Sequence, residues 1–243
     1  EPIMAQAPIE LFYWPTPNGW KISIALEEME LPYVIRPVNI GAGEQFKPEF
    51  LAISPNNRMP AITDPEGPDG KPISIFESGA ILQYLGRKTG KFYGTNAREQ
   101  AEVDQWLHWQ MGGLGPMAGQ AHHFRSYAKK IEPDETKLEY GANRYTNEVN
   151  RLYGVMDRRL VDREYLAGAY SIADMAAWPW ILPEGQGQNL EDFPNLKAWV
   201  ERLKERPALR RGRDAGKELR SNLAEDSEEA KKARAILFGQ KAL

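Results

Sequence analysis

A polar turn near the start of the chain carries two side chains that could stabilise an anion. The residues Thr16-Pro17-Asn18-Gly19 separate an apolar segment from an amphipathic one. At a strand-to-helix turn, backbone N–H groups and the positive end of the helix dipole favour a bound anion such as a thiolate. Hydrogen bonds from the Thr16 hydroxyl and the Asn18 amide would lower a thiol pKa. Thr16 and Asn18 are therefore the candidate catalytic residues, although spacing alone favours a plain helix cap.

Two later motifs offer groups that could hold the rest of a small peptide. Met59-Pro60 precedes an apolar segment, and a cis bond there would leave the Met59 backbone free to pair with an extended ligand. Glu77-Ser78 opens a helical pattern. Ser78 is a good N-cap, which is the structural alternative, but free N–H groups there could hold a carboxylate while Glu77 holds an ammonium. Together these groups suit the α-amino-acid end of a γ-glutamyl group.

Aromatic and histidine side chains gather between residues 106 and 180, where most of them are expected in the core. They are Trp106, Trp109, His122, His123, Tyr145, Trp178 and Trp180. The adjacent histidines lack nearby carboxylates at metal-ligand spacing, so no metal site is expected. Glycine-rich nucleotide loops and the GxSxG motif are absent from the sequence.

Composition excludes several classes of function. The 243 residues include no cysteine, so a cysteine nucleophile or a CxxC redox pair cannot exist, and any thiol must arrive with a ligand. The net charge of −3 argues against a nucleic-acid partner, and no apolar run reaches the length of a membrane helix. The first residues show no secretory pattern. These features predict a cytoplasmic protein that associates with neither nucleic acid nor membrane.

The elements that must position the turn and the two motifs follow from periodicity. Residues 9–14 predict a strand, 21–29 an amphipathic helix and 33–40 a second strand, which together form a βαβ unit. The segments 61–64 and 71–76 predict an antiparallel hairpin, followed by a helix that begins at Glu77-Ser78. The first domain is therefore expected to span residues 9–91, with the order βαβ-ββα.

The remainder of the chain predicts helices only. Helical spacing is found near 97–116, 136–161, 171–182 and 193–205, and Ser171 with Asp174 forms a capping-box pattern. We expect an all-helical domain over 96–209 and a charged C-terminal extension over 210–243. The fold class predicted is thus α/β in the first domain and all-α in the second.

The order of these features resembles the glutathione transferase fold, a thioredoxin-like domain followed by a helical one, over roughly residues 9–209. Five separated segments are similar to the Nu class of bacterial transferases, a class that resembles the fungal nitrogen-regulator proteins. These segments are FYWPTPNGWKISIALEE, GEQFKPEFLAISPNNRMPAI, SIFESGAILQYL, WQMGGLGPM and SIADMAAWPW.

The resemblance implies a site for glutathione, as one molecule, as two molecules or as glutathione disulfide, with no metal. Thr16 and Asn18 match the pair that approaches the glutathione sulfur. The residues that it implies for binding are Gln45 at the glycyl end, Arg58, Met59 and a cis Pro60 at the cysteinyl part, Glu77 and Ser78 at the γ-glutamyl end, and Arg144. The expected pocket for the second substrate contains Trp14, His123, Tyr145 and Trp180.

The resemblance also implies what the site does. A glutathione thiolate would attack a disulfide, or an electrophilic or ether carbon as in β-aryl ether cleaving relatives. The partners implied are a small-molecule thiol and its electrophile or disulfide, and a second copy of the chain in a homodimer. The alternative is a glutathione-transferase fold that has lost catalysis and serves in binding or regulation.

Overall fold

A four-stranded mixed sheet forms the base of the molecule in the computed structural model, which describes residues 6–242. Its strands lie in the order β2-β1-β3-β4. They are β1 (Ile9–Tyr13), β2 (Tyr33–Pro37), β3 (Ala61–Asp64) and β4 (Ile73–Phe76). β1 and β2 are parallel, whereas β1–β3 and β3–β4 are antiparallel. The predicted βαβ unit and the predicted antiparallel hairpin are therefore both confirmed.

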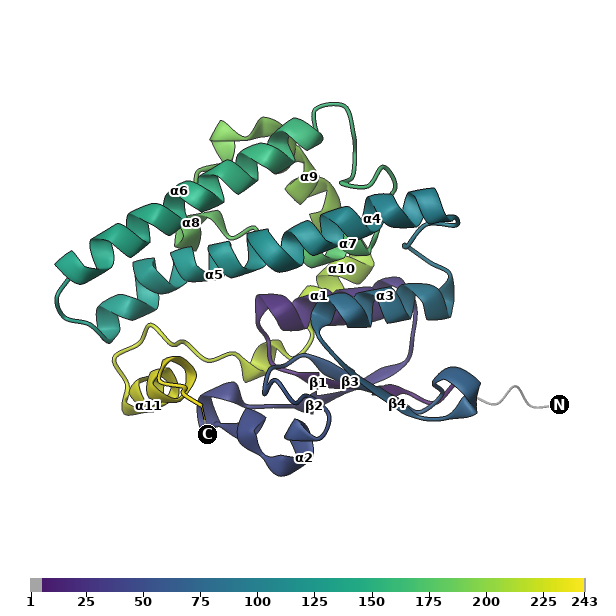
Figure 1. Cartoon of the computed structure of the whole chain (residues 1–243), viewed down its shortest axis with the longest axis horizontal. Helices are drawn as coiled ribbons and strands as arrows, with labels where there is room; N and C mark the ends of the chain where they lie inside the picture. Colours follow the sequence, from purple (N-terminus) through teal and green to yellow (C-terminus); the bar gives the residue numbers. More distant parts are fainter. Residues whose placement is uncertain (1–5, 243) are drawn as a thin grey trace.

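Two helices cover one face of this sheet (Figure 1). They are α1 (Pro17–Glu28) and α3 (Ser78–Thr89), and they pack on each other. α1 begins after Thr16 because Thr16 is extended and Pro17 supplies a preformed first turn. The connections between the strands contain η1 (Ile40–Ala42), η2 (Glu44–Phe46), α2 (Pro48–Leu51) and η3 (Pro68–Gly70).

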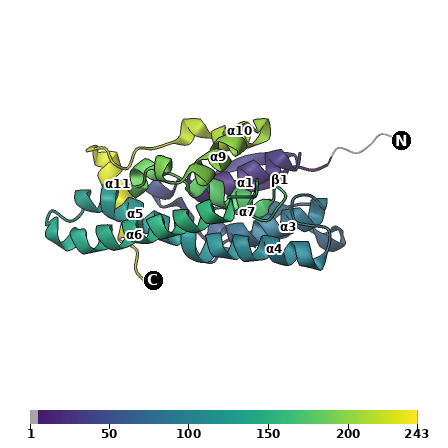
Figure 2. The same cartoon turned by 90° about the horizontal axis from the view of Figure 1, so that it is seen from above.

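The second half of the chain is helical, as predicted, and lies on the outer side of α1 and α3 (Figure 1). From above, α6 runs beside the continuous rod that contains α4 and α5 (Figure 2). The elements are α4 (Ala97–Trp109), η4 (Gln110–Leu114), α5 (Gly115–His122), η5 (His123–Tyr127), η6 (Ala128–Lys130), α6 (Thr136–Arg159), α7 (Ile172–Ala177), η7 (Trp178–Trp180), α8 (Pro183–Gln186), η8 (Leu190–Asp192), α9 (Pro194–Lys204), α10 (Pro207–Asp214), η9 (Lys217–Leu219) and α11 (Glu228–Phe238).

The rod from α4 onward continues well beyond the predicted end near residue 116. Two π-helical segments, η4 and η5, let it continue through a glycine-rich stretch that sequence patterning treats as a stop. Each π turn holds more residues than an α turn, so each changes the face on which later side chains emerge. The rod therefore carries side chains from residues 110–127 to the region above the N-terminus of α1.

The expected division between residues 209 and 210 falls inside α10, which packs along α1. Ser23 donates a hydrogen bond of 2.6 Å to the carbonyl oxygen of Gly212. A Cβ atom at Gly212 would lie 2.4 Å from the Ile24 Cα, so only glycine allows this approach. The first turn of the charged tail is thus part of the body of the protein.

The last helix, α11, returns to the N-terminal domain and packs against η1. In Figures 1 and 2 it lies near the end of α5, far along the chain from both neighbours. Ala233 faces Gly41, where an added Cβ would lie 3.1 Å from the Ala233 Cβ. Phe238 stacks on Tyr127 with ring centroids 5.4 Å apart. α11 therefore bridges the two halves of the molecule.

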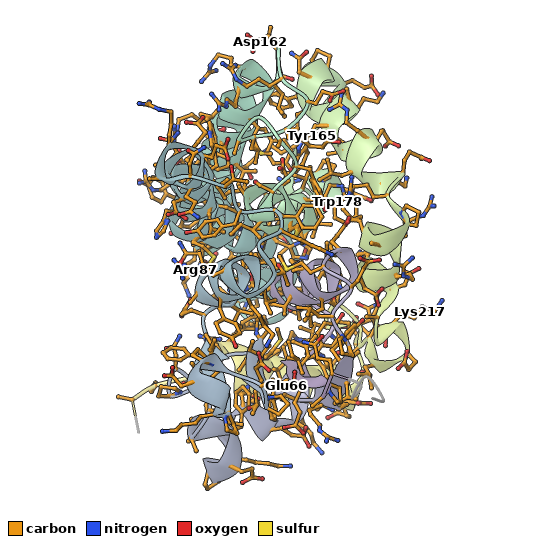
Figure 3. The ribbon with its side chains drawn as sticks, turned by 90° about the vertical axis from the view of Figure 1, so that its right-hand side faces the viewer. Glu66, Arg87, Asp162, Tyr165, Trp178 and Lys217 are labelled. Atoms are coloured by element: carbon orange, nitrogen blue, oxygen red, sulfur yellow. The ribbon has the colours of Figure 1, made fainter. Side chains whose placement is uncertain are left out.

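One contiguous hydrophobic core contains residues of both domains, from Ile9 in β1 to Leu209 in α10. Figure 3 shows the layers from the side, with Glu66 near the sheet, Arg87 on the helix layer above it and Trp178 among the packed side chains of the helical domain. The predicted capping box is present, because Asp174 accepts from the Ser171 backbone N–H and the Ser171 hydroxyl accepts from Ala173. Within residues 6–242, no helix has the length and apolar character required to cross a membrane.

Candidate active site

Thr16 stands at the N-cap of α1, where its hydroxyl is half-buried. It accepts a long hydrogen bond of 3.4 Å from the Gly19 N–H, and its own proton points to the Met59 sulfur at 3.5 Å. A thioether sulfur is a weak acceptor. The Thr16 hydroxyl can therefore turn to a stronger acceptor, such as a thiolate, at little cost.

Asn18 lies in the first turn of α1, and its orientation is fixed by a partner from the helical domain. The Trp180 Nε1–H donates to the Asn18 Oδ1 at 3.0 Å. An indole N–H can only donate, so the atom that faces it must be the amide oxygen. The Nδ2 group of Asn18 is left as a donor, next to the free N–H groups that begin every helix.

The segment before β3 passes beside the turn 16–18 and contains the cis proline that was expected. The peptide bond Met59–Pro60 is cis. No backbone hydrogen bond is found for the Met59 N–H or C=O within residues 6–242. Arg58 and Met59 line the same cavity as Asn18. An extended peptide ligand could therefore pair with the Met59 backbone.

Glu77 and Ser78 lie at the start of α3, but it is Glu77, and not Ser78, that holds the N-cap position. Glu77 holds the N-cap position with φ of 70°, and Ser78 is the first helical residue, so Ser78 does not cap the helix. The Glu77 side chain is exposed at the cavity, whereas Ser78 is buried. This left-handed backbone at Glu77 turns the N-terminus of α3 toward the cavity.

Lys21 is the feature of the site that sequence reasoning missed. Its side chain is 2% exposed, and its Nζ lies 3.2 Å from the Ser78 hydroxyl oxygen and 3.5 Å from the Met111 sulfur. Burial lowers the pKa of Lys21 to about 7, and the charge of Glu77 opposes this shift. A lysine in an amphipathic pattern predicts an exposed face, and no sequence signal marks α1 as covered on both sides.

These residues enclose one cavity of about 510 Å³ between the two domains. Gln110 is fully buried in its wall, and neither its Oε1 nor its Nε2 has a hydrogen-bond partner within residues 6–242. The cavity therefore combines cationic, anionic and neutral polar groups. Its lining is Asn18, Lys21, Asn56, Arg58, Met59, Pro60, Phe76, Glu77, Ser78, Gln110, Met111, Gly115, Pro116, Gly119, Gln120 and Trp180.

A second cavity, of about 390 Å³, adjoins the first at Gly119 and Trp180. Thr16 lies on its wall, so the turn 16–18 separates the two spaces. Trp14 also lines it, together with residues of α11. Two of the four residues expected in a substrate pocket, Trp14 and Trp180, are therefore brought to the turn.

The other two residues expected in the substrate pocket, His123 and Tyr145, lie away from the turn 16–18. His123 lines a separate cavity on the other side of Phe238, and its neighbour His122 lines the second cavity instead. His122 and His123 are adjacent and emerge on different faces of the rod, and the preceding π-helical segment η4 shifts these faces from those of a uniform α-helix. Tyr145 stacks on Phe124 at 5.6 Å and faces a cavity between α5 and α6.

Two of the expected glutathione contacts also lie away from the first cavity. Gln45 is 2% exposed, and its Nε2 donates to the Ile40 carbonyl oxygen at 3.1 Å, because η2 turns this side chain beneath η1. Arg144 is exposed on α6 and lines the same cavity as Tyr145. Within one chain, the geometry therefore assembles Thr16, Asn18, Arg58, Met59, Pro60, Glu77 and Ser78 without these two.

Among residues 6–242, no group of three His, Asp or Glu side chains is placed to hold a metal ion. The site offers hydrogen-bond donors for an anion, charged side chains for a zwitterionic ligand, and an adjoining apolar cavity. A thiolate that enters with a peptide ligand would meet the donors of Thr16 and Asn18.

Comparisons with known proteins agree with this arrangement. Residues 7–87 match the model of the glutathione S-transferase N-terminal domain, and residues 120–207 match that of the C-terminal domain. The chain is 50% identical over 203 residues to the disulfide-bond oxidoreductase YfcG of Escherichia coli, covering 82% of this chain and 92% of that protein. It is 35% identical over 221 residues to YghU, also named a disulfide-bond oxidoreductase, covering 85% and 74%.

Solved structures give the same result. A glutathione transferase from Burkholderia graminis with two glutathione molecules bound per subunit has a TM-score of 0.81 and 43% identity, covering 89% of this chain and 91% of that one. A glutathione transferase from Pseudomonas putida with one glutathione disulfide bound has a TM-score of 0.81 and 40% identity, covering 88% and 94%. This chain, with its thioredoxin-like and helical domains, belongs to the glutathione S-transferase family.

Proposed function

We propose that this protein catalyses glutathione-dependent disulfide reduction, in which the thiolate of bound glutathione attacks a disulfide sulfur. The observation that carries the proposal is a pair of donors, Thr16 Oγ1, whose proton points to a weakly accepting thioether, and Asn18 Nδ2, at the junction of a charged cavity and an apolar one. The relatives named as disulfide-bond oxidoreductases, and those that hold glutathione disulfide, support this choice.

The charges of the first cavity match glutathione in one orientation of the ligand. The γ-glutamyl ammonium would meet Glu77, and the γ-glutamyl carboxylate would meet the N-terminus of α3, the Ser78 hydroxyl and Lys21. The cysteinyl backbone would pair with Met59, beside Arg58. Contacts from Gln45 and Arg144 require the loop at 40–46 to move or a second copy of the chain to approach.

The proposed reaction needs no group on the protein that is oxidised or reduced. The glutathione thiolate forms a bond to one sulfur of the disulfide, the original S–S bond breaks, and the second sulfur leaves as a thiolate. A second glutathione then attacks the mixed disulfide and releases glutathione disulfide. Donors that favour the thiolate raise its fraction at neutral pH, and exchange is fastest when its pKa is near the ambient pH.

The finer features of the family are also proposals for this chain. The five segments quoted above support a place in the Nu class, and that class supports a homodimer. A cytoplasmic location suits the reaction, because the cytosolic pool keeps glutathione reduced. Cleavage of β-aryl ethers remains a second use of the same thiolate, supported by the apolar cavity beside Thr16.

The test is reduction of bis(2-hydroxyethyl) disulfide by glutathione, combined with calorimetric titration of reduced and oxidised glutathione. Thr16→Ala and Asn18→Ala should each lower kcat/KM by about 10- to 100-fold, because each removes one donor to the thiolate. Lys232→Ala, an exposed change on α11, is the control. Binding without turnover would leave a catalytically inactive member of the fold, and absence of binding would remove the glutathione assignment.

A further inference from the structure

We propose that Met59 and Met111 form a modification site, at which a hydroperoxide oxidises their thioethers to sulfoxides that take the donors of the first cavity away from glutathione. This inference rests on the proposed function and adds a means of regulation to the same site. The chain has seven methionines and no cysteine, so methionine carries the only side-chain sulfur that a peroxide can oxidise.

The Met59 sulfur faces the turn that carries the proposed thiolate donors. The Thr16 hydroxyl donates to this sulfur at 3.5 Å, and Met59 lines the first cavity together with Asn18 and Arg58. A thioether holds the hydroxyl weakly, so its proton stays available to a glutathione thiolate. The oxidation state of one sulfur atom therefore decides whether Thr16 can serve the thiolate.

The Met111 sulfur has the same relation to two other donors of the first cavity. The Ser78 hydroxyl oxygen lies 3.4 Å and the Lys21 Nζ 3.5 Å from it. Both groups are proposed above to meet the γ-glutamyl carboxylate. Met111 comes from η4, and its Cγ would lie only 3.1 Å from a Cβ added at Gly79, so α3 holds the side chain against these donors.

Oxidation would change each sulfur from a weak acceptor into the carrier of a strong one. A sulfoxide is polar, and its oxygen accepts hydrogen bonds. Hydrogen bonds from a hydroxyl to an oxygen span about 2.7–2.8 Å. The sulfurs already lie 3.4 to 3.5 Å from the three donors, so a new oxygen on either sulfur would reach them with little movement. Thr16 would then be held by the sulfoxide of Met59, and Lys21 and Ser78 by that of Met111.

Access to an oxidant separates these two methionines from those of the core. Met29, Met156 and Met175 are at most 2% exposed and belong to the hydrophobic core. Met59 is 9% exposed and Met111 half-buried, but both line a cavity of about 510 Å³ that a small peroxide can enter. Bound glutathione would fill the same cavity. The two sulfurs would therefore be oxidised when glutathione is scarce.

The oxidation step is a two-electron oxygen transfer. The thioether sulfur attacks the distal oxygen of the hydroperoxide, an S–O bond forms, and the O–O bond breaks. The sulfur is oxidised, and the proton of the distal oxygen passes to the leaving oxygen, so the peroxide is reduced to an alcohol, or to water in the case of hydrogen peroxide. Methionine sulfoxide reductases restore the thioether, with one enzyme for each epimer of the sulfoxide, so the modification is reversible.

The first test treats the protein with hydrogen peroxide and locates the added oxygen by peptide mass spectrometry. Met59 and Met111 should both be oxidised. S-methylglutathione at ten times its dissociation constant should slow their oxidation about tenfold, because only about a tenth of the sites stay empty. Met117, which is half-buried at the cavity between α5 and α6, is the internal control, and its oxidation should not slow.

The second test measures what the oxidation does. The oxidised wild type should bind S-methylglutathione at least about tenfold more weakly by calorimetry, and its kcat/KM for disulfide reduction should fall at least as far. Treatment with both sulfoxide reductases should restore the two values. The double variant Met59→Leu with Met111→Leu keeps the size and apolar character of both side chains. After peroxide it should keep its own untreated values, whereas Met117→Leu should respond as the wild type does.

Each other outcome overturns the inference. Equal loss in the oxidised double variant would place the sensitive group elsewhere, and unchanged binding by a wild type that carries both sulfoxides would show that the donors are not captured. Oxidation that S-methylglutathione does not slow would exclude entry of peroxide through the first cavity. Loss of the folded circular dichroism spectrum on oxidation would assign the effect to unfolding.

Failure of the proposed function gives a different result. An untreated wild type that binds S-methylglutathione without reducing disulfides would remove the proposed reaction, and the calorimetric comparison would still test the two methionines. An untreated wild type that does not bind S-methylglutathione would remove the proposed function and this inference with it.

Discussion

At the scale of the residue, the site depends on which atoms are free to donate. Asn18 could present either end of its amide to a ligand, and the indole of Trp180 decides between them. Because the choice is made by a rigid side chain from the other domain, the Nδ2 group is oriented before any ligand arrives. Preorganised donors of this kind stabilise developing or resident charge without reorganisation during the reaction.

Trp180→Phe should therefore lower kcat/KM for disulfide reduction about tenfold, since the amide of Asn18 becomes free to rotate and one donor to the thiolate is lost part of the time. Trp178→Phe is the matched control, because its Nε1–H donates to the Val200 carbonyl oxygen, away from both cavities. Steady-state kinetics on both variants provides the measurement. Equal losses in the two would show that packing, not the hydrogen bond to Asn18, is responsible.

Lys21 gives the site a dependence on pH. Its pKa of about 7 in the free protein lies below the ordinary 10.5, so between these values the folded, empty site holds the neutral amine. A ligand carboxylate placed at Ser78 would favour the ammonium and raise this pKa again. The complex would then carry a proton that the free protein lacks.

Binding of S-methylglutathione at about pH 8.5 should therefore take up close to one proton. The methylated sulfur cannot ionise, so the thiol does not contribute. Calorimetry in two buffers of different ionisation enthalpy measures the uptake, and Lys21→Met should abolish it. Uptake that persists in Lys21→Met would assign the proton to another group.

Site residues next to the end of a helix or strand could be found from the sequence, whereas site residues that matter because they are buried could not. Thr16, Asn18, Met59 and Glu77 adjoin turns, prolines or helix starts, and such signals are local. Lys21 matters because two layers cover it, and that property arises only when distant segments pack. Nothing local distinguishes it from a solvated lysine.

At the scale of the element, the contact of α1 with α10 shows how closely the helices approach. The hydroxyl of Ser23 and the absence of a side chain at Gly212 bring the backbones of α1 and α10 together, and α1 is the helix that begins at the turn 16–18. Any separation there would move α1 relative to the helical domain.

Gly212→Ala should lower the free energy of unfolding by about 1–3 kcal/mol, because its methyl group would meet backbone atoms of α1 that cannot yield. Gly112→Ala is the matched control, since a Cβ there would meet nothing within 4 Å. Its effect should stay within about 0.5 kcal/mol. Urea denaturation measures both variants, and equal values would contradict the argument.

The elements also explain why His123 lies at another cavity than Trp14 and Trp180. A uniform helical period places residues on faces correctly only while the period holds, and the π segments η4 and η5 change it twice before residue 128. Strand and helix types followed from local patterns. The faces of the rod depended on packing that the patterns do not encode.

At the scale of the whole molecule, an ion pair connects the domains. Arg206, at the start of α10, donates from two nitrogens to Glu28 in α1 at 2.7 and 2.9 Å. The guanidinium lies over the ring of Tyr170 at 3.9 Å, and the Tyr170 hydroxyl also donates to Glu28. With the shared core, this network predicts that both domains unfold together.

Arg206→Met should lower the free energy of unfolding by about 2–4 kcal/mol, since Glu28 is 9% exposed and would lose its cation. Tryptophan fluorescence and circular dichroism should still report one coincident transition. Arg202→Met is the control, because the half-buried Arg202 donates to the Glu164 carbonyl oxygen and lies 5.9 Å from the Tyr165 ring centre, but forms no ion pair within residues 6–242. Two separate transitions in the wild type would contradict the coupling of the domains.

The junction of the two cavities has a consequence for the order of events in turnover. The chain has no cysteine, so it cannot keep half of a disulfide between one substrate and the next. Thiolate and disulfide must occupy the adjoining spaces at the same moment, on either side of the turn 16–18. Initial-rate plots should therefore intersect rather than run parallel, and prior treatment of the enzyme with iodoacetamide should leave its activity unchanged. Each turnover begins with the protein in the same covalent state in which the last one ended.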